Sequence, residues 1–446
     1  MTFEMIPAYV SDALSALAER GYEAYLVGGC VRDILRGVEP HDYDLTTSAL
    51  PEQVKSVFVR EKVVETGIEH GTVTVVTDGG TLEITTFRTE CGYSDNRHPD
   101  RVAFAKTLVE DLCRRDFTVN AMAWSKKAGL TDLYGGREDL RNGVIRCVGD
   151  PGERFREDAL RLLRAVRFAS QLDFAIEPKT KRAIGAHRDL LANVSAERVF
   201  EELKKLLCGK GVARVLAEER DLLAVIIPEL KPCFDFPQRS AYHIYDVYTH
   251  TVKVVEAAPP DPVLRFAALL HDAAKPLCCV KEGEITHFKG HPEQSARIAE
   301  SVLKRLRADR ATTDSVVSLI RHHDDYAALG REAMPRLLSQ MPPERAFALF
   351  DFMEADNRAK SARGPEFLPA IENGRALLRE LLNTGFPLSV RDLNVSGEDL
   401  LAVGVPAGKP VGEMLSKMLV AVQEEKVEND RNSLLEFARD RIDKRL

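Results

Sequence analysis

Two aspartates, Asp42 and Asp44, stand two residues apart shortly after a pair of glycines, Gly28 and Gly29. Residues 24–47 read as a strand, a glycine turn, a short helix and a second strand that holds both aspartates. Side chains two residues apart on a strand share a face, so the two carboxylates would repel each other without a divalent cation. Backbone N–H groups at a glycine turn before a helix can approach a phosphate closely. The segment therefore predicts a Mg²⁺ site for phosphoryl or nucleotidyl transfer, although a plain turn and a solvated strand end would explain each motif alone.

A second charged pattern lies further along, where Asp158, Arg161, Arg164 and Arg167 recur every three positions. This spacing predicts a stripe on one helix, and the ordinary interpretation is a solvated ladder of ion pairs worth about 0.3 kcal/mol each. Cytosine and adenine, however, both present an exocyclic amine beside a ring-nitrogen acceptor, and U and G present the reverse. A carboxylate next to a guanidinium matches only the first arrangement. We therefore predict that Asp158 and Arg161 select CTP and ATP, and that Arg164 and Arg167 orient them or hold phosphate.

Histidines are concentrated in one region, since seven of the 11 fall between residues 243 and 323. Neutral imidazole and carboxylate groups are common ligands of divalent transition metals. An isolated histidine on an apolar helix is usually an ordinary core residue, and we keep that interpretation for His187, His243 and His287. The remaining candidates lie on five separate predicted helices and predict a metal centre: His250, His271 with Asp272, His291, His322 with His323, and Asp356.

The composition is that of a folded globular protein, with 446 residues, 44% hydrophobic and 29% charged residues, and a net charge of -7. It excludes disordered and fibrous classes, and the length suggests about three compact units. The N-terminal segment carries Glu4 and no long apolar run, and no later stretch is long and apolar enough to span a membrane. Scattered cysteines without a C-x-x-C pair fit a reducing cytoplasm. Residues 151–210 hold 13 Lys and Arg against 9 Asp and Glu, which makes this segment the best candidate to face phosphates.

Short β-rich runs mix with helical stretches up to about residue 150, after which almost every segment has helical periodicity. We predict an α/β N-terminal domain with a small mixed sheet and helices, followed by an all-α remainder. The expected parts are a head at 1–150, a neck at 151–210, a helical body at 211–360 and a helical tail at 361–446.

The pattern GG-x-VRD followed by D-x-D, with EDLCRRDFTVNAMAW and RFREDALRLLRAVRFA after it, resembles the DNA polymerase beta superfamily, specifically the class II tRNA nucleotidyltransferases. The likeness covers about the first 210 residues, and the tail segment VSGEDLLAVGVPAGKPVGEML is also similar to this family. It implies two-metal nucleotidyl transfer. The resemblance implies Asp42 and Asp44 for the metals, Gly29 and Arg32 for the triphosphate, Arg115 as a second nucleotide contact and Glu83 as a third carboxylate. It implies that Asp116 holds Arg115 or contacts the ribose, and an ordinary helix N-cap is the alternative for this residue.

In this family a flexible loop accompanies addition of A, and enzymes that add only C and C are shorter there. The corresponding loop after Arg88 is present in full, which favours the complete cycle. The loop is polar and contains Glu90, Tyr93, Asp95, Arg97 and Pro99. Gly135 and Gly136 are interpreted either as a hinge or as an ordinary turn.

The order H, HD, H, H(H), D resembles the HD phosphohydrolase superfamily. This resemblance implies one divalent transition metal on His250, His271, Asp272 and Asp356, and a second on His291 with His322 or His323. The metal is left open among Mn, Ni, Co, Mg and Fe.

Taken together, the sequence predicts a cytoplasmic enzyme that adds C, C and A to the tRNA 3′ end from CTP and ATP without a nucleic-acid template, and that also hydrolyses phosphate esters. No membrane partner is expected, and the oligomeric state stays open. The alternatives are a poly(A) polymerase or A-adding enzyme, and an HD phosphohydrolase whose head serves only to bind RNA.

Overall fold

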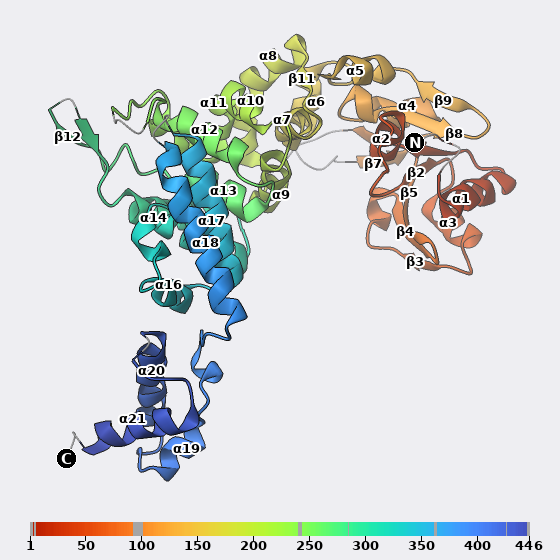
Figure 1. Cartoon of the computed structure of the whole chain (residues 1–446). Coiled ribbons are helices and arrows are strands. Elements are labelled where there is room, and N and C mark those ends of the chain that lie inside the picture. The colour runs from red at the N-terminus through yellow and green to blue at the C-terminus, as the bar shows by residue number, and fades with distance from the viewer. Residues whose placement is uncertain are drawn as a thin grey trace. The chain divides into compact units, whose positions relative to one another are not determined.

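The computed structural model describes residue 3 and residues 6–91, 101–239, 243–283, 285–360, 364–424 and 426–443 (Figure 1). The chain forms two compact units. The first comprises Met1–Lys231 with Arg305–Ala308, and the second comprises Pro232–Lys304 with Asp309–Leu446. Each unit is described by itself.

The first unit begins with a seven-stranded sheet in the order β3-β4-β5-β2-β1-β8-β9. Only β2 and β5 run parallel, and the other neighbours are antiparallel, which confirms the predicted mixed sheet. The strands are β1 (Ala24–Val27), β2 (Asp44–Thr47), β3 (Lys62–Val64), β4 (Thr72–Thr77), β5 (Gly80–Thr86), β8 (Met122–Ser125) and β9 (Gly129–Asp132), with a separate hairpin of β6 (Arg88–Cys91) and β7 (Arg101–Phe104).

Helices cover both faces of this sheet. Leu26 on β1 and Leu45 on β2 share a core with three helices, whereas Val27 points to the opposite face and packs with Leu112, because strand side chains alternate. The three helices on the first face are α1 (Ala8–Glu19), α2 (Gly29–Leu35) and α3 (Pro51–Val57); α4 (Leu108–Cys113) lies on the second, and α5 (Gly136–Asn142) follows β9.

The rest of the first unit is helical. Asp150 caps α6 by accepting a hydrogen bond from Glu153 N, and Pro151 occupies the first helical position, where no donor is needed. The elements are α6 (Pro151–Glu157), α7 (Leu160–Leu172), α8 (Pro178–His187), α9 (Ala196–Leu207), α10 (Val212–Glu218) and α11 (Arg220–Ile226), with a short parallel pair of β10 (Val144–Ile145) and β11 (Ala175–Ile176).

The second unit is almost entirely helical, and α17 and α18 lie side by side in it (Figure 1). Its body contains α12 (Val247–Ala257), α13 (Pro262–Leu270), α14 (His291–Arg305), α15 (Arg310–His322), α16 (Met334–Gln340), α17 (Pro343–Arg358) and α18 (Leu368–Asn383), with the hairpin β12 (Val280–Glu282) and β13 (Ile285–His287). The last helices, α19 (Gly397–Ala402), α20 (Lys409–Gln423) and α21 (Arg431–Asp443), share a hydrophobic core of their own.

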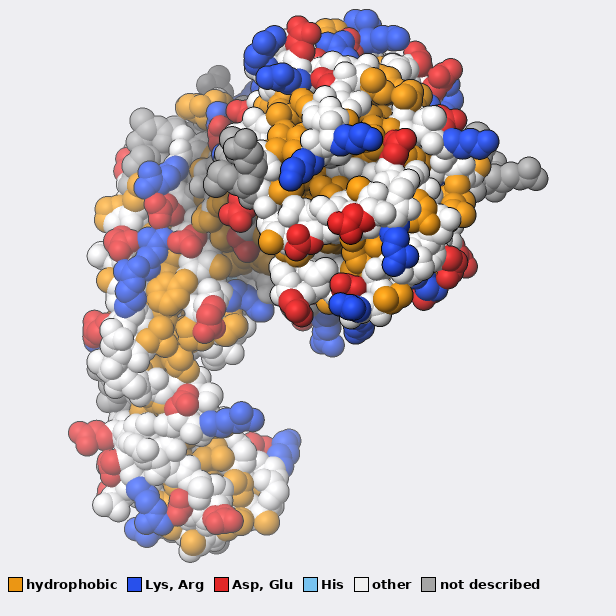
Figure 2. All heavy atoms as spheres, turned by 90° about the vertical axis from the view of Figure 1, so that its right-hand side faces the viewer, with side chains coloured by type: hydrophobic (Ala, Val, Ile, Leu, Met, Phe, Trp, Pro, Cys, Tyr) orange, Lys and Arg blue, Asp and Glu red, His pale blue; other side chains and the backbone are white. Residues whose placement is uncertain are grey.

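In the described part of the chain, no helix has the length and apolar character needed to cross a membrane. Basic and acidic side chains are interspersed on the face shown in Figure 2. Any nucleic-acid contact on that face must therefore depend on local groups rather than on a field of one sign.

Candidate functional site

The glycine turn after β1 brings a cation and a carboxylate together. Gly28 has φ 79° and ψ -132°, a conformation open essentially only to glycine. A Cβ atom at this position would lie 3.3 Å from Arg115 Nη1 and 3.9 Å from Asp44 Oδ2. Gly29 begins α2, where a Cβ would lie 3.6 Å from Arg32 Nη2. The missing side chains therefore leave room beside Arg32, Arg115 and Asp44.

The carboxylates lie slightly differently from the prediction. Strand β2 begins at Asp44, and the exposed Asp42 precedes it, so the expectation that both residues lie in the strand is wrong. Asp44 pairs in register with Glu83 on the parallel strand β5. Residues in register on neighbouring strands point to the same face, so Glu83 lies beside Asp44, at the place given to a third carboxylate.

These groups also interact electrostatically. The pKa of Asp44 is raised to about 6, first by burial and then by the nearby carboxylates of Asp42 and Glu83, against the opposing charge of Arg115. A cluster of carboxylates with this unfavourable interaction fits a hard divalent cation, which binds through oxygen ligands.

Arg115 is held by a residue that the sequence analysis missed. Asp111 on α4 is fully buried and accepts hydrogen bonds from Arg115 Nη2 at 3.1 Å, from Arg114 Nη2 at 2.8 Å and from Thr46 Oγ1 at 3.2 Å. The spacing of Asp111 and Arg115, four residues apart on a helix, was the available signal. The suggestion that Asp116 holds Arg115 is therefore wrong, because Asp111 does so.

Asp116 instead binds the helical neck. Arg164 on α7 donates to Asp116 Oδ2 from Nε at 2.9 Å and from Nη2 at 2.6 Å. Burial alone would raise the pKa of Asp116, but the charge and hydrogen bonds of Arg164 lower it to about 2. Asp116 is therefore ionised and ties the sheet domain to α7.

The predicted base-selecting residues do not lie on one helix. Asp158 ends α6 with φ -136° and ψ 106°, and Arg161 lies in the first turn of α7. Asp158 Oδ2 accepts from Arg198 Nη2 at 2.8 Å, while Arg161 contacts Glu157 and donates to Arg114 O at 3.0 Å. The two side chains are thus each held by other partners, which the sequence analysis did not name.

Arg167, the last residue of the predicted stripe, donates to Glu202 Oε2 at 2.5 Å. Gly136 packs tightly, since a Cβ there would lie 2.2 Å from Thr118 O, and Gly135 takes φ 75° before α5. This packing supports the turn interpretation of the glycine pair. The predicted loop residues Tyr93, Asp95, Arg97 and Pro99, and the side chain of Glu90, lie outside the described residues.

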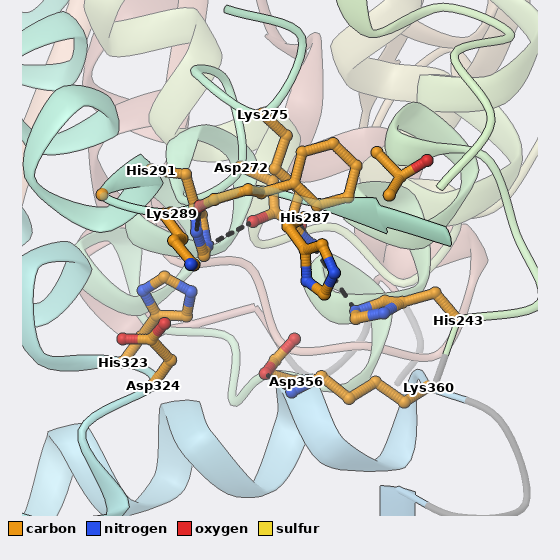
Figure 3. Close-up of a pocket in the computed structure, with 13 residues that line it drawn as sticks. His243, Asp272, Lys275, His287, Lys289, His291, His323, Asp324, Asp356 and Lys360 are labelled. Carbon is orange, nitrogen blue, oxygen red and sulfur yellow. Dashed lines mark hydrogen bonds and ion pairs between the residues drawn. The ribbon is translucent and has the colours of Figure 1, made fainter. Parts of the chain in front are cut away.

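The histidine cluster forms in the second unit around a pocket of about 330 Å³ (Figure 3). Three overlapping groups each have ligand atoms within 4.8 Å of one another. They are His250, His271 and Asp356; His271, Asp272 and His323; and His291, His323 and Asp324.

Backbone carbonyls orient the imidazole rings. Nδ1 of His271 lies 2.8 Å from Ala268 O, that of His291 lies 2.9 Å from Phe288 O, and that of His323 lies 2.7 Å from Ile320 O. A carbonyl only accepts, so each Nδ1 carries the proton and each Nε2 offers its lone pair. This arrangement is typical of metal-bound histidine.

The carboxylates of this cluster are buried and face two lysines. Lys275 Nζ lies 2.7 Å from Asp272 Oδ2, and Lys360 Nζ lies 2.5 Å from Asp356 Oδ2. Asp272 Oδ1 lies 3.3 Å from His291 Nε2, and among the described residues neither oxygen of Asp272, nor Asp356 Oδ2, accepts a well-aligned hydrogen bond. Buried carboxylates and imidazole lone pairs in this state fit a divalent cation.

Three histidine assignments change. His323 is buried against His271 and His291, with ring centroids 5.2 Å from each, whereas His322 is half-buried next to Asp325. The structure therefore brings His323 into the cluster in place of His322. His243, interpreted as a core residue, lines the pocket edge-on to His250 at 5.0 Å, and His287 lines it too.

This fold and these sites define a class of protein. It is a polymerase-type nucleotidyltransferase followed by a helical RNA-binding part and an HD part. Family models match in the same order: "Poly A polymerase head domain" over 24–146, "Probable RNA and SrmB- binding site of polymerase A" over 173–234, "HD domain" over 241–351 and "tRNA nucleotidyltransferase domain 2 putative" over 388–438.

Individual relatives are more specific than the family models. The CCA-adding enzyme of Ligilactobacillus salivarius is 34% identical over 458 residues, covering 100% of both chains. That of Lactobacillus helveticus is 55% identical over 196 residues, 44% of this chain and 49% of that one. The crystal structure of the Bacillus stearothermophilus CCA-adding enzyme in complex with CTP matches with a TM-score of 0.75 and 31% identity over 99% of both chains. The chain belongs to the family of CCA-adding enzymes, which are tRNA nucleotidyltransferases.

Proposed function

We propose that this protein adds C, C and A in order to the 3′ end of tRNA, taking CTP and ATP as substrates and releasing pyrophosphate. One observation carries the proposal: Asp44 lies in register with Glu83 and near Arg115 at a turn that only Gly28 allows. This places a cation site and a phosphate-binding cation next to each other. Family membership supports the choice of tRNA as the substrate.

Asp42 and Asp44 would hold two Mg²⁺ ions, with Glu83 beside them as a third carboxylate. Bound Mg²⁺ would lower the pKa of the RNA 3′-hydroxyl and neutralise charge on the leaving pyrophosphate. Arg32 and Arg115 bind the triphosphate, and the guanidinium of Arg115 is kept in place by the buried Asp111.

We place the incoming base against Asp158 and Arg161. The carboxylate of Asp158 accepts the exocyclic amine, and the guanidinium of Arg161 donates to the ring nitrogen. Asp158 is held by Arg198, and Arg161 is held by Glu157. A wrong base would leave buried polar groups unpaired, at a cost of about 1–3 kcal/mol for each group.

The test uses a tRNA transcript that ends before its three terminal nucleotides. Product length on a gel should increase by two residues with CTP alone and by three with CTP and ATP. Asp44→Asn should abolish extension, and Asp78→Asn, a change in the exposed β4–β5 turn, should not. A long ladder with ATP alone would instead identify a poly(A) polymerase.

The histidine cluster supports a second activity, the metal-dependent hydrolysis of phosphate esters. His250, His271, Asp272 and Asp356 would hold one metal, and His291 with His323 a second; such a metal would supply an activated water. Lys275, Lys289 and Lys360 line the pocket and favour an anionic substrate (Figure 3).

This activity is tested by stripping metal with a chelator, adding Mn, Ni, Co, Mg or Fe singly, and following p-nitrophenyl phosphate hydrolysis. His271→Ala should lose hydrolysis and keep nucleotide addition, and Asp44→Asn should do the reverse. Loss of both activities in either folded variant would refute two separate centres. Hydrolysis in an unaltered protein that adds no nucleotide would favour a head that only binds RNA.

A further inference from the structure

A buried asparagine connects Arg32, which binds the triphosphate in the proposed function, to Arg164 on α7. Asn120 ends the short 3-10 helix Thr118–Asn120 and is 6% exposed. Its Oδ1 accepts from Arg32 Nη1 at 2.8 Å, and its Nδ2 donates to Asp116 Oδ1 at 3.2 Å. The other oxygen of Asp116 accepts from Arg164. A continuous hydrogen-bonded chain therefore runs from Arg32 through Asn120 and Asp116 to Arg164.

An amide suits the middle of this chain because it accepts through its oxygen and donates through its nitrogen. One neighbour of Asn120 is a guanidinium, which only donates, and the other is a carboxylate, which only accepts. An aspartate would repel Asp116, and an aliphatic residue would satisfy neither neighbour. The amide therefore fixes the distance between Arg32 and Arg164.

An aromatic ring supports the same arginines. Phe168 on α7 is 6% exposed, and the guanidinium carbons of Arg32 and Arg164 each lie 5.4 Å from its centroid. That of Arg167 lies 3.7 Å away. Stacking on a ring keeps a guanidinium oriented at a small cost in conformational entropy.

Arg32 uses only some of its N–H donors in contacts with the described residues. Asp33 accepts from Nε and Nη2, each at 2.9 Å, and Asn120 accepts from Nη1. A guanidinium has five N–H donors. Among the described residues these contacts use three of them, which leaves two for a ligand beside Gly29.

We infer that Asn120, supported by Phe168, is a positioning residue that holds the triphosphate-binding Arg32 in a fixed position relative to Arg164 on α7, the helix that also carries Arg161. This inference rests on the proposed function. It predicts that Asn120 contributes both to triphosphate affinity and to discrimination between bases, although it touches neither part of the nucleotide.

The experiment compares Asn120→Leu with the unaltered protein on the shortened tRNA. Inhibition by inorganic pyrophosphate, which has no base, reports on Arg32, and its Ki should rise about tenfold, or ~1.4 kcal/mol. The ratio of kcat/KM for CTP over UTP reports on the base side and should fall at least about fivefold. Asn142→Leu, at an exposed asparagine on α5, is the matched control and should change neither value.

A double-mutant cycle separates positioning from general stability. In an Arg32→Lys background, Asn120→Leu should have less than about a twofold further effect on the pyrophosphate Ki, because the shared contact is already lost. Phe168→Leu should lower the CTP preference in the same direction and provides a second variant if Asn120→Leu does not fold.

Unchanged Ki and unchanged CTP preference in folded Asn120→Leu, or full additivity with Arg32→Lys, would overturn the inference. A purely structural role would lower the melting temperature and the active fraction without moving either ratio. Failure of the unaltered protein to add C, C and A would instead refute the proposed function, so the two failures are distinguishable.

Discussion

At the scale of single residues, the nucleotidyltransferase site combines carboxylates that are unfavourable together with arginines that are firmly held. Asp44 lies in register with Glu83 and close to Asp42, and its pKa is raised to about 6, first by burial and then by these neighbours. The arginines, in contrast, are fixed by ionised partners such as Asp111 and Asp116. The arginines of the site are therefore held in place before a ligand binds, whereas its carboxylates repel one another.

This repulsion between carboxylates predicts that the stability of the metal-free protein depends on pH. The pKa of Asp44 is about 6 in the folded state and near 3.8 in the unfolded state, so the folded state binds more protons between these values. Stability must then fall as pH rises from about 4 to 6. In a chelator at pH 8, Asp44→Asn should be more stable than the unaltered protein by about 1–2 kcal/mol, and the difference should shrink at pH 4.

Thermal unfolding at the two pH values measures this difference. Asp78→Asn, in the exposed turn after β4, should show no such pH-dependent gain. An Asp44→Asn protein that is less stable at pH 8 would show that the carboxylates do not repel each other in the folded state.

At the scale of elements, the strand, glycine turn, helix and strand that carry the site could be predicted because their periodicity and glycine spacing are local. Two element boundaries could not be predicted. Asp42 precedes β2, and Asp158 interrupts the expected helix although no proline or glycine is present there. Asp158 Oδ1 accepts from Leu160 N at 3.0 Å, and Oδ2 binds Arg198 from a distant helix. Local capping and a tertiary contact therefore override helical periodicity.

Long-range pairings explain the remaining differences. Thr46 donates a hydrogen bond to Asp111, which lies 65 positions later in the sequence. Arg32 donates one to Asn120, which lies 88 positions later. His323 was not separable from His322 by sequence, because only packing decides which neighbour at the end of α15 turns inward. The residue types of both sites were thus predictable, but not their partners.

The glycine turn gives a second prediction at this scale. Gly28 and Gly21 both have positive φ, 79° and 84°, but their surroundings differ. A Cβ added at Gly28 would lie 3.3 Å from Arg115 Nη1, whereas one added at Gly21 would meet nothing within 4 Å. Both alanine variants should lose about 1 kcal/mol or more of stability from backbone strain.

Nucleotide addition should separate the two variants. Gly28→Ala should reduce kcat/KM for CTP by more than about tenfold, because the Arg115 guanidinium must move by a few tenths of an ångström. Gly21→Ala should leave kcat/KM within about twofold of the unaltered protein. Equal losses in both variants would mean that the turn acts only through stability.

At the scale of the whole molecule, each compact unit contains the described residues of one candidate site. The residues of the nucleotidyltransferase site lie within Met1–Lys231, and the histidine cluster lies within the second unit. The proposed limits of 1–150, 151–210, 211–360 and 361–446 stay a prediction, since the division into two units falls at residue 231. A separate core in α19, α20 and α21 fits a distinct tail, for which we predict contact with tRNA.

The order of addition without a template is the central claim, and sequencing the products tests it most directly. The shortened tRNA is incubated with Mg²⁺ and all four nucleoside triphosphates at equal concentration, and the new 3′ ends are read. The account predicts C, C and A with no further residue in the unaltered protein, and misincorporated U or G in folded Asp158→Asn. A run of A, or U and G incorporated as readily as C by the unaltered protein, would contradict it.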